Sequence, residues 1–403
     1  MRHRMTALRC LATAIALSLV GAMHAAPRAR AVSITQLPLA GTAAGFVAPV
    51  PGGVAVGGVG GPRAFSLIAA PSSTAVSPGP AGPLAEGGVT VGPDGGTWYL
   101  SSTTVRGPEG TAHTFSTILE ATAAGAVERA RYPSGGYAPV AMATGADGAL
   151  WIADIGEGGS IDRYEPGGTI VHYPTLGLPI GIVAGPDGAL WFTQAAPCIG
   201  YGGPCVGRIS TTGEISDYPL PIASEAYGIT VGADGALWLA EWQSGTIGRL
   251  STSGQLAQFP VPRPTAPARG FESVTPRNLT AGPDGAIWFT DPGDNSIGRV
   301  SSTGQVSEYP IPPLARSERL LATVPQAGPD GIAAGPGGVL WANEGTATAI
   351  ARIDPSAVGQ VALAPARVSR SCPQRAAARL MARRRRGRAQ CARARPRRGT
   401  ANG

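Results

Sequence analysis

The sequence predicts an all-β protein, a seven-bladed β-propeller of four-stranded antiparallel blades. The main observation is a phrase that recurs six times: a Gly, then Asp-Gly (Gly-Gly in the last copy), then a small or aliphatic pair and a Trp, at Trp98, Trp151, Trp191, Trp238, Trp288 and Trp341. Successive Trp residues are 53, 40, 47, 50 and 53 positions apart. A repeat of strand-like segments with a period of about 40 to 50 residues is typical of propellers.

A second phrase follows each Trp and completes the blade. It reads Ile-Gly-Arg or a variant, a Gly turn, and an alternating segment that ends in Tyr-Pro, as in 206–219, 297–310 and, more loosely, 161–174. For the fifth unit this predicts strands over 228–231, 236–241, 246–250 and 255–260. Asp-Gly is a strong hairpin signal, and we expect the Trp and Ile side chains to pack between neighbouring blades. Four antiparallel strands per unit, repeated radially, make a propeller.

The first blade is degenerate, and the last one needs a strand from elsewhere. Residues 46–56 keep the outline of two strands and a turn without the Trp, and 65–68 fits a third strand. The last unit ends near residue 353 with little room for its outer strand. Residues 33–38 look like an outer strand without a blade, so we expect the N-terminal strand to close the ring. Residues 361–363 are the competing strand.

The two ends differ in composition from the repeats. Residues 1–31 combine Arg residues, an apolar run over about 11–22 and an Ala-Arg-Ala sequence, as in a secretory signal peptide. The apolar run is too short to span a bilayer comfortably. The sequence thus predicts export as a monomer, with a signal peptide over 1–31, a propeller over 32–365 and an Arg-rich, disordered tail over 366–403. Cleavage near Ala22, Ala25 or Ala31 stays open.

The net charge of +7 arises from these ends. Of the 32 basic residues, 13 lie in the tail and five in the leader, which leaves 14 against 25 acidic residues, near −11. Two readings of the tail stay open: contact with a polyanion such as nucleic acid, a teichoic polymer or anionic lipid, and a solvated extension.

The cysteines fit an oxidising compartment. Cys198 and Cys205 flank a turn-rich loop, and a disulfide between them contributes about 2.5 kcal/mol on the loop-entropy model. A zinc site is the poorer interpretation, because no further Cys or His lies at ligand spacing. If the segment between Cys372 and Cys391 is helical, these residues are roughly 28 Å apart, too far for a disulfide.

Candidate site residues lie where the first two strands of each blade meet the axis. Residues seven before and seven after the centre of the turn are predicted to face each other, in the pairs Val140/Asp154, Ile180/Gln194, Tyr227/Glu241, Arg277/Asp291 and Asp330/Glu344. Carboxylates that converge at one mouth suit a hard cation, Mg²⁺ or Ca²⁺, or a cationic ligand. The alternative is that these acids merely make the rim soluble.

The phrases Gly-Pro-Asp-Gly-Ala-Leu-Trp-Phe-Thr, Ile-Gly-Arg-Ile and Glu-Tyr-Pro resemble those of the virginiamycin B lyase family over roughly 32–355. That resemblance implies a seven-bladed propeller that opens a cyclic depsipeptide by elimination at its ester, with Mg²⁺ and a His base. The family motif Glu-Pro-His-Gly-Ile, with a Glu fourteen residues after the His, matches 225–229. The resemblance therefore implies Glu225 and Glu241 as metal ligands, with Asp154, Asp291 and Glu344 as further candidates.

The two histidine positions of the family differ in this chain. Tyr227 stands at the catalytic His, and Ile180 stands at a substrate-contacting His in the preceding blade. A phenol that titrates near 10 is a poor general base at neutral pH, whereas imidazole is well matched. We expect weak or absent lyase turnover, with Ile180, Arg277 and Asp330 in contact with a small-molecule or peptide-like ligand. The alternatives are a non-catalytic extracellular binding propeller and a metal-dependent hydrolase of the lactonase type.

Overall fold

The structure is a computed structural model. It describes residues 32–38, 43–59, 65–68, 77–78, 87–106, 112–133, 136–156, 158–195, 198, 200, 202–262, 275–312, 330–343 and 349–356. All of them lie in the first of two units of the chain, Met1–Gly359. The predicted leader over 1–31 and tail over 366–403 lie outside the described residues and stay predictions. Within the described ranges, no helix is long and apolar enough to cross a membrane.

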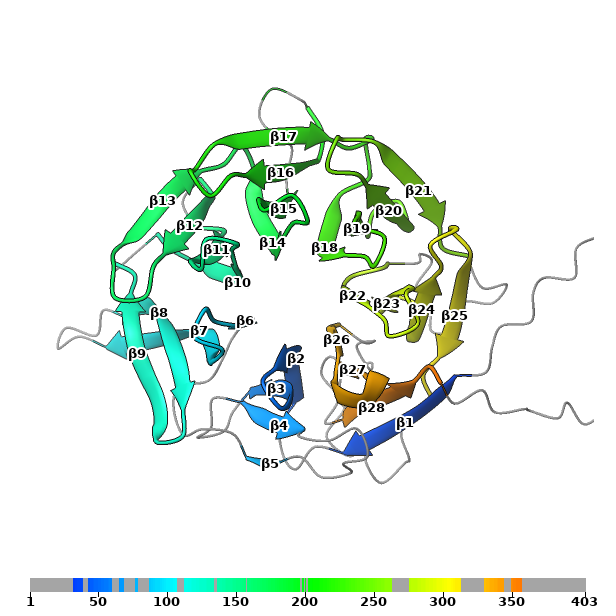
Figure 1. The fold of residues 1–403 in the computed structure, drawn as a ribbon, viewed down its shortest axis with the longest axis horizontal. Helices are drawn as coiled ribbons and strands as arrows, with labels where there is room; N and C mark the ends of the chain where they lie inside the picture. The colour runs from blue at the N-terminus through cyan, green and yellow to red at the C-terminus, as the bar shows by residue number, and fades with distance from the viewer. Residues whose placement is uncertain are drawn as a thin grey trace, which may run out of the picture. The chain divides into compact units, whose positions relative to one another are not determined.

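Seven four-stranded antiparallel sheets stand around a central axis as the blades of a propeller (Figure 1). The first three blades are β2 (Ala43–Val50), β3 (Gly53–Val59), β4 (Ser66–Ile68) and β5 (Ser77–Pro78); β6 (Gly87–Val91), β7 (Thr97–Arg106), β8 (Ala112–Thr122) and β9 (Gly125–Arg131); and β10 (Pro139–Thr144), β11 (Leu150–Asp154), β12 (Ser160–Tyr164) and β13 (Ile170–Pro174).

The fourth to sixth blades are β14 (Leu178–Ala184), β15 (Leu190–Ala195), β16 (Cys205–Ile209) and β17 (Ile215–Pro219); β18 (Ala226–Val231), β19 (Leu237–Glu241), β20 (Thr246–Leu250) and β21 (Leu256–Pro260); and β22 (Leu279–Ala281), β23 (Ile287–Asp291), β24 (Ser296–Val300) and β25 (Val306–Pro310). The seventh contains β26 (Ile332–Ala334), the 3-10 turn Pro336–Gly338, β27 (Leu340–Asn343) and β28 (Ala349–Asp354). The predicted fold class is confirmed.

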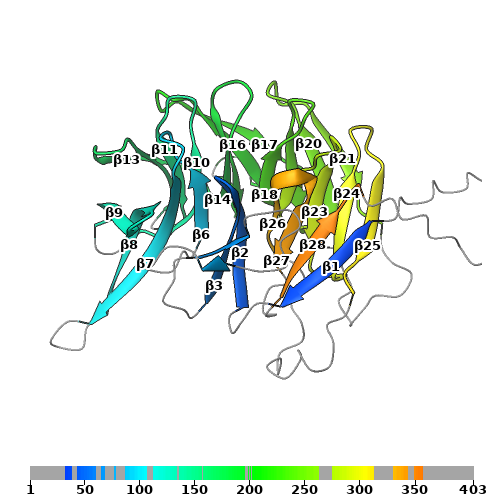
Figure 2. The ribbon, with the colours of Figure 1, turned by 60° about the horizontal axis from the view of Figure 1, so that its bottom comes forward.

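The N-terminal strand β1 (Ser33–Pro38) completes the seventh blade, as predicted. It pairs antiparallel with β28, with Ser33 opposite Asp354 and Pro38 opposite Ala349. Figures 1 and 2 show β1 beside β28 at the closure of the ring. The competing strand over 361–363 lies outside the described residues. The ring is therefore closed by hydrogen bonds between the two ends of the propeller.

The Asp of each Asp-Gly turn fixes its hairpin. In five blades its Oδ1 accepts the indole N–H of the Trp four residues later, at 3.0–3.1 Å: Asp94–Trp98, Asp147–Trp151, Asp187–Trp191, Asp234–Trp238 and Asp284–Trp288. In four blades Oδ2 accepts an N–H of a third-strand Arg at 2.6–2.9 Å: Arg163, Arg208, Arg249 and Arg299. The following glycine has a φ of 69–78°, a conformation that side chains disfavour.

The repeated Trp residues fill the layers between blades, as predicted. Trp98 belongs to one buried cluster with Met142 and Ile152 of the next blade. Trp341 of the seventh blade belongs to a cluster with Val54 and Val56 of the first. Each sheet thus packs on both faces, and only the innermost strands border the axis.

A β-bulge near the start of the innermost strand corrects the predicted pairing. The register places Ala226, not Tyr227, opposite Glu241, and Ile229 opposite Leu239. The same irregularity pairs Pro179 with Gln194 and Pro139 with Asp154, so the predicted pairs are wrong by one residue in the third to fifth blades. A bulge sets two residues against one on the partner strand and re-aims their side chains.

The bulge exists because its backbone groups bond to neighbouring blades. The N–H of Gly228 donates to the carbonyl oxygen of Arg277 at 2.9 Å, and the hydroxyl of Thr193 donates to that of Tyr227 at 2.7 Å. These bonds replace ladder bonds within the sheet. The spacing of the repeat does not predict these bonds between blades.

The predicted disulfide between Cys198 and Cys205 is present, with Cα atoms 6.1 Å apart. Both cysteines are fully buried. The bond connects the loop after β15 to the start of β16. This prediction is confirmed, whereas Cys372 and Cys391 lie outside the described residues.

Replacing Asp234 tests the turn. Asp234→Ala leaves the buried indole N–H of Trp238 without its acceptor, which costs about 1–3 kcal/mol. Asp234→Asn keeps an acceptor and loses the charge opposite Arg249, a partly exposed pair worth about 1 kcal/mol or less. Urea unfolding followed by tryptophan fluorescence should rank wild type, Asn and Ala in that order. Equal midpoints for wild type and Asp234→Ala would refute the role of the turn.

Candidate functional site

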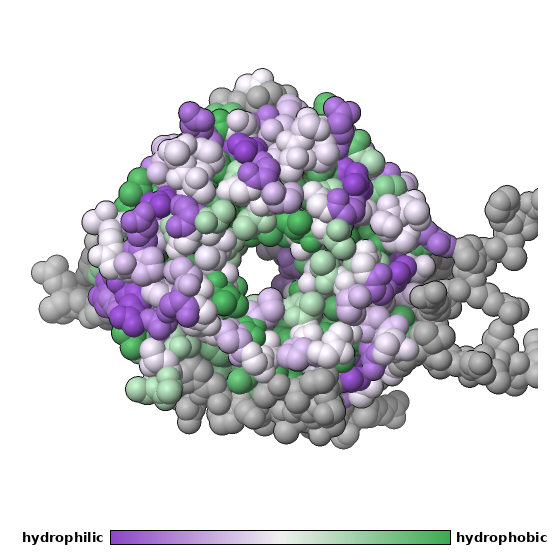
Figure 3. All heavy atoms as spheres, in the orientation of Figure 1, coloured by the Kyte–Doolittle hydropathy of each residue, from purple (hydrophilic) through white to green (hydrophobic). Residues whose placement is uncertain are grey.

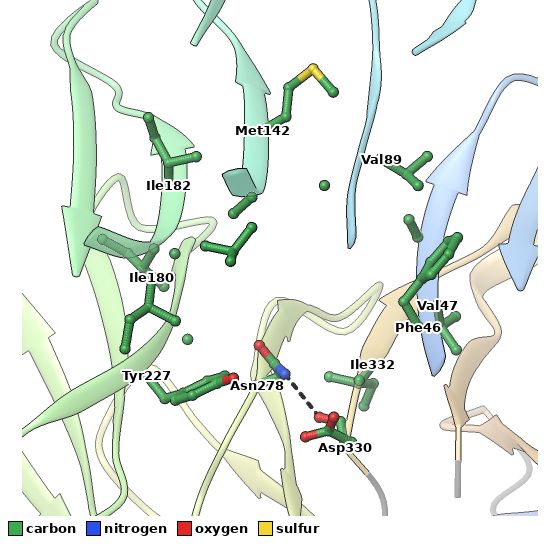
Figure 4. Close-up of a pocket in the computed structure, with 18 of the residues that line it drawn as sticks. Phe46, Val47, Val89, Met142, Ile180, Ile182, Tyr227, Asn278, Asp330 and Ile332 are labelled. Carbon is green, nitrogen blue, oxygen red and sulfur yellow. Dashed lines mark hydrogen bonds between the residues drawn. The ribbon is translucent and has the colours of Figure 1, made fainter. Parts of the chain in front are cut away.

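A cavity of about 680 Å³ occupies the axis of the ring. Figure 3 shows the opening with hydrophobic residues around it. The innermost strands supply apolar side chains to the wall, among them Phe46, Val89, Met142, Ile182 and Ile332, while polar side chains and backbone atoms expose a comparable area. In Figure 4 the labelled polar side chains gather on one side of the cavity, at Tyr227, Asn278 and Asp330. The cavity is therefore amphipathic, with one polar edge.

Arg277 is in contact with two residues of this edge, although it does not itself line the cavity. Its guanidinium carbon lies 4.7 Å from the ring centroid of Tyr227, within the range of a cation–π contact. Its Nε lies 3.0 Å from Oδ1 of Asp330, so the two side chains form an ion pair. The N–H bond does not point at Oδ1, and this buried oxygen therefore accepts no hydrogen bond from the described residues. The side chains of Arg277 and Asp330 are 45 % and 42 % exposed, so both groups can reach a ligand.

Burial lowers the pKa of Arg277, but the hydroxyl of Tyr227 and the charge of Asp330 outweigh it, and the pKa lies above its ordinary value. The guanidinium therefore stays charged. A charged planar guanidinium suits carbonyl and carboxylate oxygens.

Hydrogen bonds between blades hold the polar edge in place. The carbonyl oxygen of Asp330 accepts from Asn278 Nδ2 at 3.0 Å and from the hydroxyl of Thr290 at 2.8 Å. The neighbouring bulges place Tyr227 and Ile180 on the cavity wall. Three of the residues predicted from sequence, Ile180, Tyr227 and Asp330, thus line the cavity, and Arg277 lies against Tyr227 and Asp330. Asn278 was not predicted from the sequence, because it belongs to none of the recurring phrases and a single amide next to Arg277 indicates no particular chemistry.

The predicted carboxylates do not open into this cavity. Asp154, Gln194, Glu241 and Asp291 are at most 1 % exposed, and none lines the cavity. The expectation of a solvated acidic funnel is wrong for these residues. The reason is that they end the second strand of each blade, whose side chains point into the layers between sheets. Glu344 lies outside the described residues.

The two glutamates matched to the family's metal site do not fit a magnesium ion. Oε2 of Glu241 accepts hydrogen bonds from Ser244, Thr246 and Gln258 inside the blade. Oε2 of Glu225 accepts a hydrogen bond of 2.7 Å from Nε2 of Gln243 at the surface. Gln243 does not donate to Glu241. Oε1 of Glu241 is buried without a hydrogen-bond partner, but among the described residues neither glutamate belongs to a group of three metal-ligating side chains, and Mg²⁺ demands a near-octahedral set of oxygens.

One predicted carboxylate has acidic neighbours that sequence reasoning missed. Asp291, Asp294 and Glu308 offer carboxylate oxygens that lie within 4.8 Å of one another, a group that could hold a metal. Asp294 lies in a turn and Glu308 on an outer strand, so neither falls at the expected mouth. An alignment of the fifth and sixth repeats would have shown them, because Asp294 and Glu308 stand where the fifth repeat has Ser244 and Gln258.

A pH series on Glu241→Gln tests the burial of this side chain. Burial raises the pKa of Glu241 against the lowering effect of its hydrogen bonds, so the folded protein binds its proton more tightly than the unfolded chain. Its contribution to stability is present below the unfolded pKa and is lost as the pH rises through the folded pKa. The melting temperature of Glu241→Gln relative to wild type should therefore increase from about pH 5 to pH 8.

Glu225→Gln, which removes a carboxylate bonded at the surface, is the control for the loss of one negative charge. A relative melting temperature of Glu241→Gln that falls with pH would contradict the assigned burial.

Comparison with known proteins places the chain in a family. The sequence profile of the virginiamycin B lyase family matches residues 88–271 and 177–373, more than half of the chain. No curated protein matches it. A solved streptogramin B lyase shares the fold, with a TM-score of 0.61 and 24% identity over 80% of this chain and 97% of that chain.

Virginiamycin B lyase from Staphylococcus aureus superposes with a TM-score of 0.60 and 26% identity, over 80% of this chain and 99% of that one. A catalytically inactive variant of that lyase, solved with quinupristin, gives a TM-score of 0.57 and 26% identity over the same shares. With the profile match and the shared seven-bladed ring, this chain belongs to the virginiamycin B lyase family.

Proposed function

We propose that this chain binds an amphipathic, peptide-like ligand in the central cavity and is at most a weak streptogramin lyase. The observation that carries the proposal is the group of polar side chains, Tyr227, Asn278 and Asp330, on one side of a cavity that many apolar side chains also line, with Arg277 in contact with Tyr227 and Asp330. Mostly apolar cavities with a few convergent polar groups are typical ligand sites. The solved relative with quinupristin suggests the ligand class.

The polar edge offers complementary groups to a peptide-like molecule. Arg277 presents guanidinium N–H donors to carbonyl or carboxylate oxygens. The side chain of Asp330 is 42 % exposed, and its carboxylate can accept an amide N–H. The apolar wall suits the side chains of such a ligand.

The same geometry argues against efficient elimination. An ester elimination needs a base within hydrogen-bond reach of the proton that it removes. None of the described residues around the cavity is a histidine. His172 lies on the outer strand β13, where its Nδ1 is 2.8 Å from Asp162. Of the two family histidine positions, Tyr227 carries an ionisable group and Ile180 offers none.

We further propose that the protein is exported and that the Arg-rich tail contacts polyanions. The leader composition and the 13 Arg residues of the tail support these two proposals. Mass spectrometry of protein from the culture medium should give a mature N-terminus between residues 23 and 32. Retention of an uncleaved chain in the cell would refute export.

Two measurements test the proposal: ligand binding tests the peptide-like ligand site, and ring opening tests the weak lyase activity. Quinupristin should bind the full chain in calorimetry, and mass spectrometry should show little ring opening with or without Mg²⁺. Arg277→Ala should weaken binding about tenfold or more, because a charged hydrogen bond of about 1.5–3 kcal/mol is lost. Arg277→Lys is the matched control and should lose less. Absence of binding by the wild type would end the proposal, and rapid turnover would overturn its second half.

Restoring the two histidines tests the reason for weak turnover. Tyr227 and Ile180 both line the cavity from neighbouring blades. The double variant Tyr227→His, Ile180→His should open the depsipeptide faster than wild type, whereas Tyr227→Phe should not. If the wild type instead opens the depsipeptide rapidly and the Tyr227→Phe variant does not, the phenol of Tyr227 serves as the base.

A further inference from the structure

The sixth blade contains three carboxylates that do not belong to the cavity. Asp291 ends β23, Asp294 lies in the turn to β24, and Glu308 lies on β25 opposite Gly298. One carboxylate oxygen of each lies within 4.8 Å of the others. Three oxygens bound to one Ca²⁺ at about 2.3–2.6 Å have separations in this range.

The oxygens are oriented as ligands, and the protein leaves some of them unpaired. Asp291 is fully buried, and its Oδ1 accepts the N–H groups of Thr275 and Gly293, each at 3.0 Å. Its Oδ2 is buried and has no hydrogen-bond partner among the described residues, and the same is true of Oδ2 of Asp294. A buried carboxylate oxygen without a donor is costly unless a cation or a proton meets it.

No described basic side chain forms an ion pair with these three acids; the bridges of the described ranges involve other residues. Burial raises the pKa of Asp291 and of Asp294. Burial and the charges of Asp291 and Asp294 raise the pKa of Glu308 to about 7. These raised pKa values mean that the cluster binds protons readily, and no described basic side chain balances the charge of its ionised form.

The fifth blade provides an internal comparison. At the positions of Asp291, Asp294 and Glu308 it has Glu241, Ser244 and Gln258, as the matching registers show. There, Ser244 and Gln258 donate hydrogen bonds to Oε2 of the single carboxylate, whose Oε1 is buried without a partner among the described residues. In the fourth blade Gln194 likewise donates to Asp217 at 2.7 Å. In the sixth blade acids replace both donors, so a cation or a shared proton has to take their place, and the one donor to Glu308 is the hydroxyl of Ser296 at 3.0 Å.

We propose that Asp291, Asp294 and Glu308 bind a calcium ion inside the sixth blade. The ion joins the turn between β23 and β24 to β25 and so stabilises the blade. Three carboxylates favour Ca²⁺, because Mg²⁺ usually keeps several waters and takes one or two carboxylates. The site is separate from the ligand cavity, since none of the three residues lines it.

The test compares the chelator-treated full chain with a variant that copies the fifth blade, Asp294→Ser with Glu308→Gln. Calorimetry should find one Ca²⁺ per wild-type chain, and CaCl₂ at about 100 times Kd should raise the melting temperature by about 5 °C. The variant should lose this response and, in chelator, melt no lower than wild type, because like charges are removed. Glu241→Gln is the matched control and should keep the response.

Three results would overturn the proposal. The first is a wild-type melting temperature that millimolar Ca²⁺ leaves unchanged, which means that the carboxylates share a proton. The second is a Ca²⁺ response that survives in the double variant, which places the ion elsewhere. The third is a response to MgCl₂ without one to CaCl₂. If the double variant does not fold, Glu308→Gln alone is measured, and undiminished Ca²⁺ affinity then has the same meaning as the second result.

Discussion

The contact on which each regular blade depends is the turn carboxylate that holds an indole N–H and, in four blades, a guanidinium N–H. The indole is buried against the next blade, so one Asp couples the hairpin to the packing between sheets. The seventh blade shows what happens without it: Gly337 replaces the Asp, and the buried indole nitrogen of Trp341 has no partner among the described residues. The outer strand of that blade is β1, from the other end of the propeller.

The bulges of the innermost strands divide polar residues into two groups with different roles. Residues on the bulge, such as Tyr227 and Ile180, line the axis and are available to a ligand. Residues that end the second strand, such as Glu241, lie between the sheets and take part in hydrogen bonds within the blade. A member of the virginiamycin B lyase family can therefore keep acidic residues at family positions without presenting them to a ligand. The buried acids of the sixth blade follow the same division.

Local patterns were enough to predict the blades, their turns, the disulfide and the closing strand, because each depends on nearby residues or on a regular spacing. The meeting of Tyr227, Arg277 and Asp330 was also predictable, since the starts of innermost strands in successive blades must be neighbours around the axis. The one-residue shift opposite Glu241 was not, because it depends on bonds between blades such as Gly228 to Arg277. The acidic group around Glu308 was missed for a similar reason: it combines strands and a turn that only the folded blade brings together.

The central claim is that the axial edge around Arg277 binds the ligand and that the matched glutamates take no part. A crystal structure of the full chain grown with quinupristin and MgCl₂ tests it most directly. Ligand density should lie in contact with Tyr227, Asp330 and the adjacent Arg277, and Glu241 should still be bonded to Thr246 and Gln258. A magnesium ion between Glu225 and Glu241, or a ligand bound away from the axis, would contradict it.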